Sequence, residues 1–239
     1  MSGIRAVIFD CYSTLVDIKT DESKPDIYRY LSLYLQYYGA KIEGKGLKAA
    51  LNREKDKYMR GKNERYPEVD LEAVFSRILK REGLNNSFLA ESCCKLFRLL
   101  SRERFQLFSD SLPVLTEIKN NGLLLAIASD AQKVFCLMEG QMLGINQFFD
   151  HIVMSTQFGF RKPDSRLFTI ACSLLGIPPD KAVYIGDHPE KDVKGPKEIG
   201  MQTILLDRAS QNTGLNSDMA PDFHAKNLWE AWEWIRQRA

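Results

Sequence analysis

Five short runs of apolar residues constrain the fold of this chain more than any other feature. They cover residues 6–9, 123–128, 151–154, 182–185 and 203–206. Each run is apolar along its whole length instead of alternating with polar residues, so each predicts a β-strand that is buried on both faces. Strands of this kind occur in parallel sheets with helices on both sides.

Helical segments separate the later runs and complete the pattern. They cover residues 112–120, 133–143, 166–175 and 192–199. Several of them end next to a glycine, the residue that most readily ends a helix. Strand and helix therefore alternate as in a doubly wound, Rossmann-like α/β domain. Residues 228–238 predict a last amphipathic helix, whose three tryptophans we assign to packing.

More than a hundred residues separate the first two runs, which is too many for a single crossover helix. Their apolar residues recur at helical spacing in about four segments and predict a small α-helical bundle. We therefore predict two domains. An α/β core is formed by residues 1–16 and 108–239, and an inserted helical cap by residues 17–107.

The charge of the chain gives little indication of a macromolecular partner. The formal net charge is +2, and 44% of the residues are hydrophobic, so a folded protein without a nucleic acid or membrane partner is expected. Residues 17–107 hold 19 Lys and Arg against 14 Asp and Glu, whereas the remainder holds 14 against 17. A basic cap over an acidic core suits an anionic substrate, although an evenly solvated helical surface gives the same count.

The N-terminal segment and the cysteines point to the cytoplasm. The first apolar run is interrupted by Asp10, so the segment resembles neither a signal peptide nor a membrane span. Five cysteines without CxxC spacing predict reduced thiols. We interpret the adjacent Cys93 and Cys94 as buried core residues of a helix.

Polar residues follow the first four runs, at the edge of the sheet where open α/β folds bind ligands. The sequences are Asp10-Cys11-Tyr12-Ser13-Thr14 after the first run, Ser129-Asp130 after the second, Lys162-Pro163 after the third, and Gly186-Asp187-His188-Pro189-Glu190-Lys191-Asp192 after the fourth. Singly, such residues are common as helix caps and turns. Together and in this order they resemble the haloacid dehalogenase superfamily, whose helical cap is inserted after the first strand.

The resemblance, which extends over the whole chain, implies a Mg²⁺ site and a carboxylate nucleophile. Asp10 would be the nucleophile, and Asp10 and Asp187 would bind the metal together with the main-chain carbonyl of Tyr12. Asp192 would support the metal without binding it directly. Mg²⁺ prefers oxygen ligands and commonly takes one or two carboxylates and a substrate phosphate oxygen, which agrees with this set.

The resemblance also implies how a phosphorylated small molecule would be held. Ser129 and the N–H of Asp130 would bind the phosphoryl oxygens, and Thr14 offers another hydroxyl. Lys162 would place a positive charge beside both Asp10 and the phosphoryl group. The reaction expected is hydrolysis of a phosphomonoester through an aspartyl-phosphate on Asp10.

Tyr12 departs from the phosphatase pattern, and its presence leaves two alternatives open. Phosphatases of the superfamily carry an acid at this position, and a tyrosine is a weak acid at neutral pH. The Tyr12 form resembles the metal-independent 2-haloacid dehalogenases, but these carry Ser and Asn where this chain has Asp187 and Pro189. A protein that keeps the fold and metal with little turnover is the other alternative. Ser13 replaces the usual glycine.

Residues of the predicted cap are candidates for substrate selection. Glu64, Arg65 and Tyr66 lie in a polar turn between two predicted helices. Arg53 occupies a position that could match the halide-binding arginine of the dehalogenases, although a solvated helix arginine is the simpler interpretation. The oligomeric state does not follow from the sequence.

Overall fold

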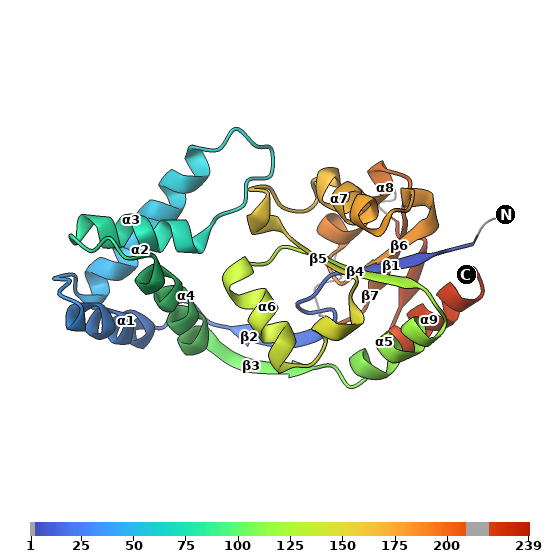
Figure 1. Ribbon diagram of the computed structural model, residues 1–239, viewed down its shortest axis with the longest axis horizontal. Coiled ribbons are helices and arrows are strands. Elements are labelled where there is room, and N and C mark those ends of the chain that lie inside the picture. Colours follow the sequence, from blue (N-terminus) through green and yellow to red (C-terminus); the bar gives the residue numbers. More distant parts are fainter. Residues whose placement is uncertain (1–2, 209–219) are drawn as a thin grey trace.

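A computed structural model describes residues 3–208 and 220–239 of the chain. Figure 1 shows two parts side by side, a helical cap formed by α1 to α4 and a larger α/β core that contains both termini. The fold is thus a Rossmann-like α/β core with a helical cap, as predicted.

The core is built on a six-stranded sheet with the strand order β5-β4-β1-β6-β7-β8. Every neighbouring pair is parallel. The strands are β1 (Ala6–Phe9), β4 (Leu124–Ser129), β5 (His151–Met154), β6 (Ala182–Gly186), β7 (Gln202–Leu206) and β8 (Phe223–Ala225). The five predicted strands are confirmed to within one residue at either end. β8 was not predicted, because three residues are too few to give a pattern.

Helices cover both faces of the sheet, since successive side chains of a strand point to opposite sides. On β1, Val7 and Phe9 belong to one apolar cluster, which also contains residues of α5, α6 and α9. Ala6 and Ile8 belong to a second cluster, packed against α7. The helices are α5 (Ser111–Asn120), α6 (Lys133–Met142), α7 (Ser165–Leu175), α8 (Gly195–Glu198) and α9 (Leu228–Arg236).

The segment after β6 differs from its prediction. In place of one helix over residues 192–199, a π-helical turn covers Glu190–Lys194 and the four-residue α8 follows. Gly195 explains part of this arrangement, because a Cβ added there would lie 2.4 Å from the main-chain oxygen of Pro163. The close contact holds this segment against the loop that carries Lys162.

The cap has a hydrophobic core of its own, made by apolar faces at helical spacing. Its helices are α1 (Pro25–Tyr37), α2 (Gly44–Arg60), α3 (Leu71–Arg81) and α4 (Ser87–Ser101). Asp70 and Asn86 cap α3 and α4 by accepting a main-chain N–H three residues later. Cys93 and Cys94 are fully buried in this core, as predicted.

A two-stranded antiparallel ribbon, which was not predicted, joins the cap to the core. It consists of β2 (Val16–Thr20) and β3 (Arg102–Leu107), with Val16 opposite Leu107. Both strands are half exposed and rich in charged residues, so neither gives the apolar signal of a core strand. The predicted domain boundaries near 16 and 108 fall at one end of this ribbon, and the division remains a prediction.

Over residues 3–208 and 220–239, no helix combines the length and the apolar character needed to cross a membrane. All five cysteines are buried free thiols.

Candidate active site

A cavity of about 260 Å³ opens at the C-terminal ends of β1, β4 and β6. β1 has β4 on one side and β6 on the other, so the strand order changes direction here. Open α/β sheets usually bind their ligands at such a point, outside the C-terminal ends of the strands. The residues that line the cavity are Asp10, Tyr12, Ser13, Ser129, Asp130, Lys162, Asp187, His188 and Lys191. All nine lie within the four motifs from which the site was predicted.

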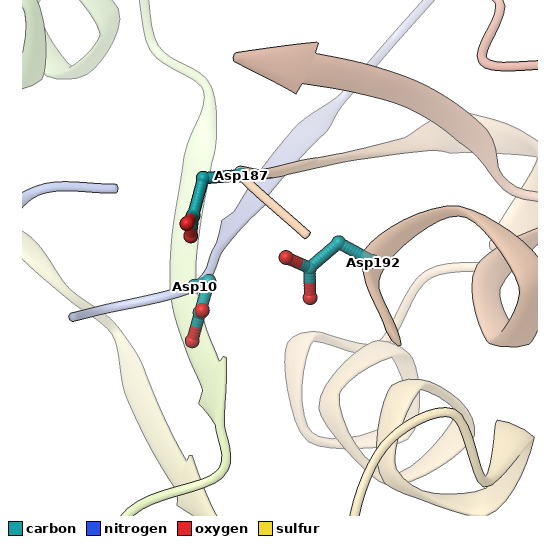
Figure 2. Close-up of side chains that lie close together, drawn as sticks. All are labelled: Asp10, Asp187 and Asp192. Carbon is teal, nitrogen blue, oxygen red and sulfur yellow. The ribbon is translucent and has the colours of Figure 1, made fainter. Parts of the chain in front are cut away.

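Three carboxylates lie close together here, and two of them, Asp10 and Asp187, line the cavity (Figure 2). Asp10 follows β1, Asp187 follows β6, and Asp192 lies in the π-helical turn. One oxygen from each lies within 4.8 Å of the others. Asp10 is 8% exposed and Asp192 is 1% exposed, so their mutual repulsion is poorly screened by water. A buried donor set of carboxylate oxygens with this spacing fits a divalent cation that prefers oxygen ligands.

Lys162 provides a buried positive charge beside these carboxylates. Its Nζ lies 3.0 Å from Asp10 Oδ1 and 2.7 Å from Asp192 Oδ1. Burial by itself would lower the pKa of Lys162, but the charges of Asp10 and Asp192 outweigh burial and raise the pKa well above its ordinary value. These charges favour the protonated form of Lys162, and one ammonium group does not balance three carboxylates.

Burial and the excess of negative charge together raise the pKa of Asp187. Burial, followed by the charges of Asp10 and Asp192, raises the pKa of Asp187 from 3.8 to about 7. The hydroxyl of Thr14 donates to Asp187 Oδ1 over 3.1 Å and favours the charged form. A metal cation beside Asp187 would favour its charged form more strongly than the hydroxyl of Thr14 does.

Thr14 does not lie where the sequence suggested. Its side chain is fully buried and does not line the cavity, so it is not placed to bind a substrate. Its contact with Asp187 makes it a positioning residue for that carboxylate. The preceding Ser13 has φ of 63°, in the left-handed region that favours glycine, which accounts for glycine being usual here.

Asp192 is held by two donors. Its Oδ1 accepts from Lys162 Nζ and its Oδ2 accepts from the main-chain N–H of His188 over 2.9 Å. Gly186 makes room for this carboxylate, because a Cβ there would lie 2.3 Å from Asp192 Oδ2. Both oxygens have partners, which agrees with a supporting position for Asp192.

Ser129 and Asp130 occupy the end of β4. Ser129 is 1% exposed and borders the cavity. Asp130 Oδ1 accepts from the main-chain N–H of Lys162 over 2.8 Å, and its Oδ2 lies 3.6 Å from Lys191 Nζ. The carboxylate of Asp130 therefore fixes the loop that carries Lys162.

Tyr12 is turned toward the cap and forms a network that sequence reasoning missed. Its hydroxyl donates to Glu139 Oε2 over 2.5 Å. Arg98 of α4 donates to both oxygens of the same carboxylate, over 2.8 and 2.9 Å. Burial is the main cause that raises the pKa of the Tyr12 phenol far above its ordinary value. This phenol is therefore a poor proton donor, and the network connects the cap to α6.

The predicted cap turn lies against the core and does not line the cavity. Glu64 forms an ion pair with Arg166 of α7, and the Arg65 guanidinium stacks on the ring of Tyr66. The main-chain oxygen of Tyr66 accepts from the N–H of Arg161, next to Lys162. Arg53 has a side chain that is 54% exposed, as expected for a solvated helix arginine.

The fold and the site define a class of protein in which a Rossmann-like α/β core carries an acidic cluster at the C-terminal ends of its strands and a helical cap after the first strand. Residues 4–200 match the family described as haloacid dehalogenase-like hydrolase. The chain belongs to this family.

The curated relatives of this chain include phosphatases. A glyceraldehyde 3-phosphate phosphatase from Methanopyrus kandleri is 31% identical over 134 residues, which cover 55% of this chain and 58% of that protein. A phosphoserine phosphatase from Thermus thermophilus is 28% identical over 159 residues, covering 66% and 62%. The aligned part thus spans about three-fifths of each relative.

Among solved structures, a 2-haloacid dehalogenase from Pseudomonas syringae pv. Tomato DC3000 superposes with a TM-score of 0.69. The alignment covers 99% of this chain and 100% of that one, at 22% identity. A likeness at this identity shows the shared fold and does not distinguish between the two chemistries.

Proposed function

We propose that the protein is a Mg²⁺-dependent phosphatase that hydrolyses a small phosphorylated metabolite through a covalent intermediate on Asp10. The observation that carries the proposal is the close approach of Asp10, Asp187 and Asp192, with the ammonium of Lys162 beside Asp10 and Asp192. Three closely spaced carboxylates, two of them buried, with one buried cation suit a site that takes up a divalent cation before it accepts an anionic substrate. The names of the curated relatives support the same class of reaction.

Asp10, Asp187 and the main-chain carbonyl of Tyr12 would hold the metal, while Asp192 would keep Lys162 and the His188 loop in place. When bound, Mg²⁺ supplies positive charge that offsets the repulsion between the nucleophile and the phosphoryl oxygens.

Asp10 is the nucleophile of the proposed reaction. Its Oδ1 accepts from the N–H of Cys11 over 2.8 Å and lies beside Lys162, so the carboxylate is held in one orientation. In the first step, a carboxylate oxygen of Asp10 forms a bond to phosphorus, and the bond between phosphorus and the leaving oxygen breaks. Lys162 and Ser129 stabilise the transferring phosphoryl oxygens. Water then hydrolyses the acyl phosphate and regenerates the carboxylate.

The leaving oxygen receives no proton from residue 12 in this proposal, because Tyr12 is committed to Glu139. Loss of a general acid commonly lowers the rate by about 10² to 10⁴. Substrates whose leaving group is stable as an anion suffer least from this loss. An aryl phosphate is therefore the appropriate first probe.

The cap and the charge distribution support a small anionic substrate. The cavity of about 260 Å³ admits a metabolite of modest size and contains both Lys162 and Lys191. The excess of basic residues in the 17–107 segment acts in the same direction. We expect the reaction to take place in the cytoplasm, as the five cysteines without CxxC spacing predict.

A metal-independent 2-haloacid dehalogenase is the second candidate, and Tyr12 is the residue that favours it. In that reaction Asp10 would attack carbon and expel a halide. The acidic pair Asp10 and Asp187 argues against it, since two carboxylates that line the cavity would repel a substrate carboxylate. A binding protein that keeps the metal with little turnover is the third possibility.

One assay separates these three. The protein is incubated with p-nitrophenyl phosphate and with 2-chloropropionate, each with Mg²⁺ and with EDTA, and phosphate and chloride are measured. We expect phosphate release that needs Mg²⁺ and that is abolished in Asp10→Asn. Chloride release insensitive to EDTA would establish the dehalogenase instead. Absence of both products, with Mg²⁺ still bound, would establish the binding protein.

A further inference from the structure

Tyr184 is a buried residue that contacts Lys162 and takes no part in the proposed reaction described above. It lies on β6, three residues before Asp187, and is fully buried. Its ring packs edge-on against Phe168 of α7, with the ring centroids 4.8 Å apart. The sequence predicts Tyr184 only as one residue of the apolar strand over residues 182–185. A hydroxyl at this position has to find a hydrogen-bond partner, because burial without one is costly.

The hydroxyl of Tyr184 connects β4 to the ammonium of Lys162. It donates its proton to the main-chain oxygen of Ala128 over 2.7 Å, immediately before Ser129. It accepts from Lys162 Nζ over 3.1 Å. A phenol has a single proton, so the bond to β4 leaves the lone pairs of the oxygen directed at Lys162.

Lys162 has three N–H donors and three neighbours that accept. Asp192 Oδ1 and Asp10 Oδ1 lie 2.7 and 3.0 Å from its Nζ, and the Tyr184 oxygen is the third. Lys162 is 2% exposed, so water does not replace a lost acceptor freely. The two carboxylates attract the ammonium by charge, and the neutral phenol adds an acceptor whose position is fixed by the sheet.

We propose that Tyr184 is a positioning residue for the phosphoryl-transfer reaction. Its hydroxyl holds the Lys162 ammonium in the position from which it contacts both Asp10 and the incoming phosphoryl group. This inference rests on the proposed function of Lys162. Without the phenol, the flexible side chain of Lys162 retains only the two acidic partners, and the ammonium moves toward Asp192, its shorter contact. The sequence carried no sign of this role, since Tyr is also an ordinary strand residue.

The test is Tyr184→Phe, with Tyr28→Phe as the matched control. Tyr28 is also a buried tyrosine whose hydroxyl donates to a main-chain oxygen, that of Glu22, but it lies in the cap. With p-nitrophenyl phosphate and Mg²⁺, kcat of Tyr184→Phe should fall about tenfold to a hundredfold, the factor expected for one hydrogen bond to a charged group. Its KM should change less than about threefold, and Tyr28→Phe should keep the wild-type kcat.

A double-mutant cycle separates positioning from a merely structural role. In the Lys162→Met background, Tyr184→Phe should change kcat by less than about twofold, because the group that it positions is absent. An equal loss in both backgrounds, or an unchanged kcat in Tyr184→Phe alone, would overturn the inference. Absence of phosphate release by the wild type would instead refute the proposed function. If Tyr184→Phe does not fold, a ring-fluorinated tyrosine at position 184 replaces it, because its hydroxyl is a weaker acceptor on a side chain of nearly the same shape. This variant should have a lower kcat and an unchanged Tm. An unchanged kcat in this variant would also overturn the inference.

Discussion

Acidification should weaken Mg²⁺ binding to this protein about tenfold for each pH unit below about pH 7. The reason is Asp187, whose pKa is raised to about 7 in the absence of a cation. Below that pH its carboxyl group carries a proton, and Mg²⁺ must displace this proton to bind. Above that pH the site is already deprotonated, and the affinity should level off.

The size of the effect follows from the same shift. The pKa of Asp187 rises from 3.8 to about 7, and at 1.36 kcal/mol per unit this corresponds to about 4 kcal/mol of unfavourable interaction in the charged state. Because the folded state holds the proton more tightly than the unfolded state, the free energy of unfolding of the metal-free protein should fall as pH rises from about 4 to about 7. Bound Mg²⁺ should remove this decline by stabilising the charged form.

Isothermal titration calorimetry with Mg²⁺ from about pH 5 to about pH 8 measures this dependence. Asp187→Asn should bind Mg²⁺ weakly at every pH and without the slope. Asp150→Asn, which precedes β5 at the opposite end of the sheet, is the control and should keep the wild-type slope. A Kd that does not change between pH 5 and pH 7 would refute the placement of Asp187 at the metal.

Three substitutions test the supporting contacts. Tyr12→Phe should keep kcat for an aryl phosphate within about threefold of wild type, since the phenol is not the acid of the reaction, and a hundredfold loss in steady-state kinetics would contradict this. Arg98→Met leaves the buried Glu139 without its bidentate partner and should cost about 3 to 5 kcal/mol in urea unfolding, with a cost below about 1 kcal/mol counting against the network. Gly186→Ala, whose Cβ would lie 2.3 Å from Asp192 Oδ2, should lower kcat more than tenfold, and wild-type kinetics would show that Asp192 need not stay in place.

Much of the core could be predicted from the sequence because its strands are buried on both faces. Such strands are continuously apolar and stand out from their surroundings, so β1 and β5 were predicted with their observed limits. The ribbon of β2 and β3 is half exposed and carries charged residues, so it lacks that signal. Its strands pair across an insertion, and local patterns do not report contacts at that separation.

The candidate site likewise has a part that the sequence predicts and a part that it does not. Asp10, Ser129 and Asp187 were predicted because parallel strands bring the residues at their C-terminal ends together. The contact between Arg98 and Glu139 joins residues 41 positions apart, on helices whose spacing alone does not place them face to face. The contact of Thr14 with Asp187 could not be predicted, because the position of Thr14 in the loop does not reveal that its side chain turns inward.

The most direct test of the account is to look for the covalent intermediate. The enzyme is mixed with an aryl phosphate carrying a radiolabelled phosphoryl group, quenched in acid during turnover and digested, and the labelled peptide is sequenced by mass spectrometry. The account predicts a phosphoryl group on Asp10, sensitive to hydroxylamine as acyl phosphates are and absent from Asp10→Asn. Sustained Mg²⁺-dependent phosphate release with the label on another residue, or from an active Asp10→Asn protein, would contradict it.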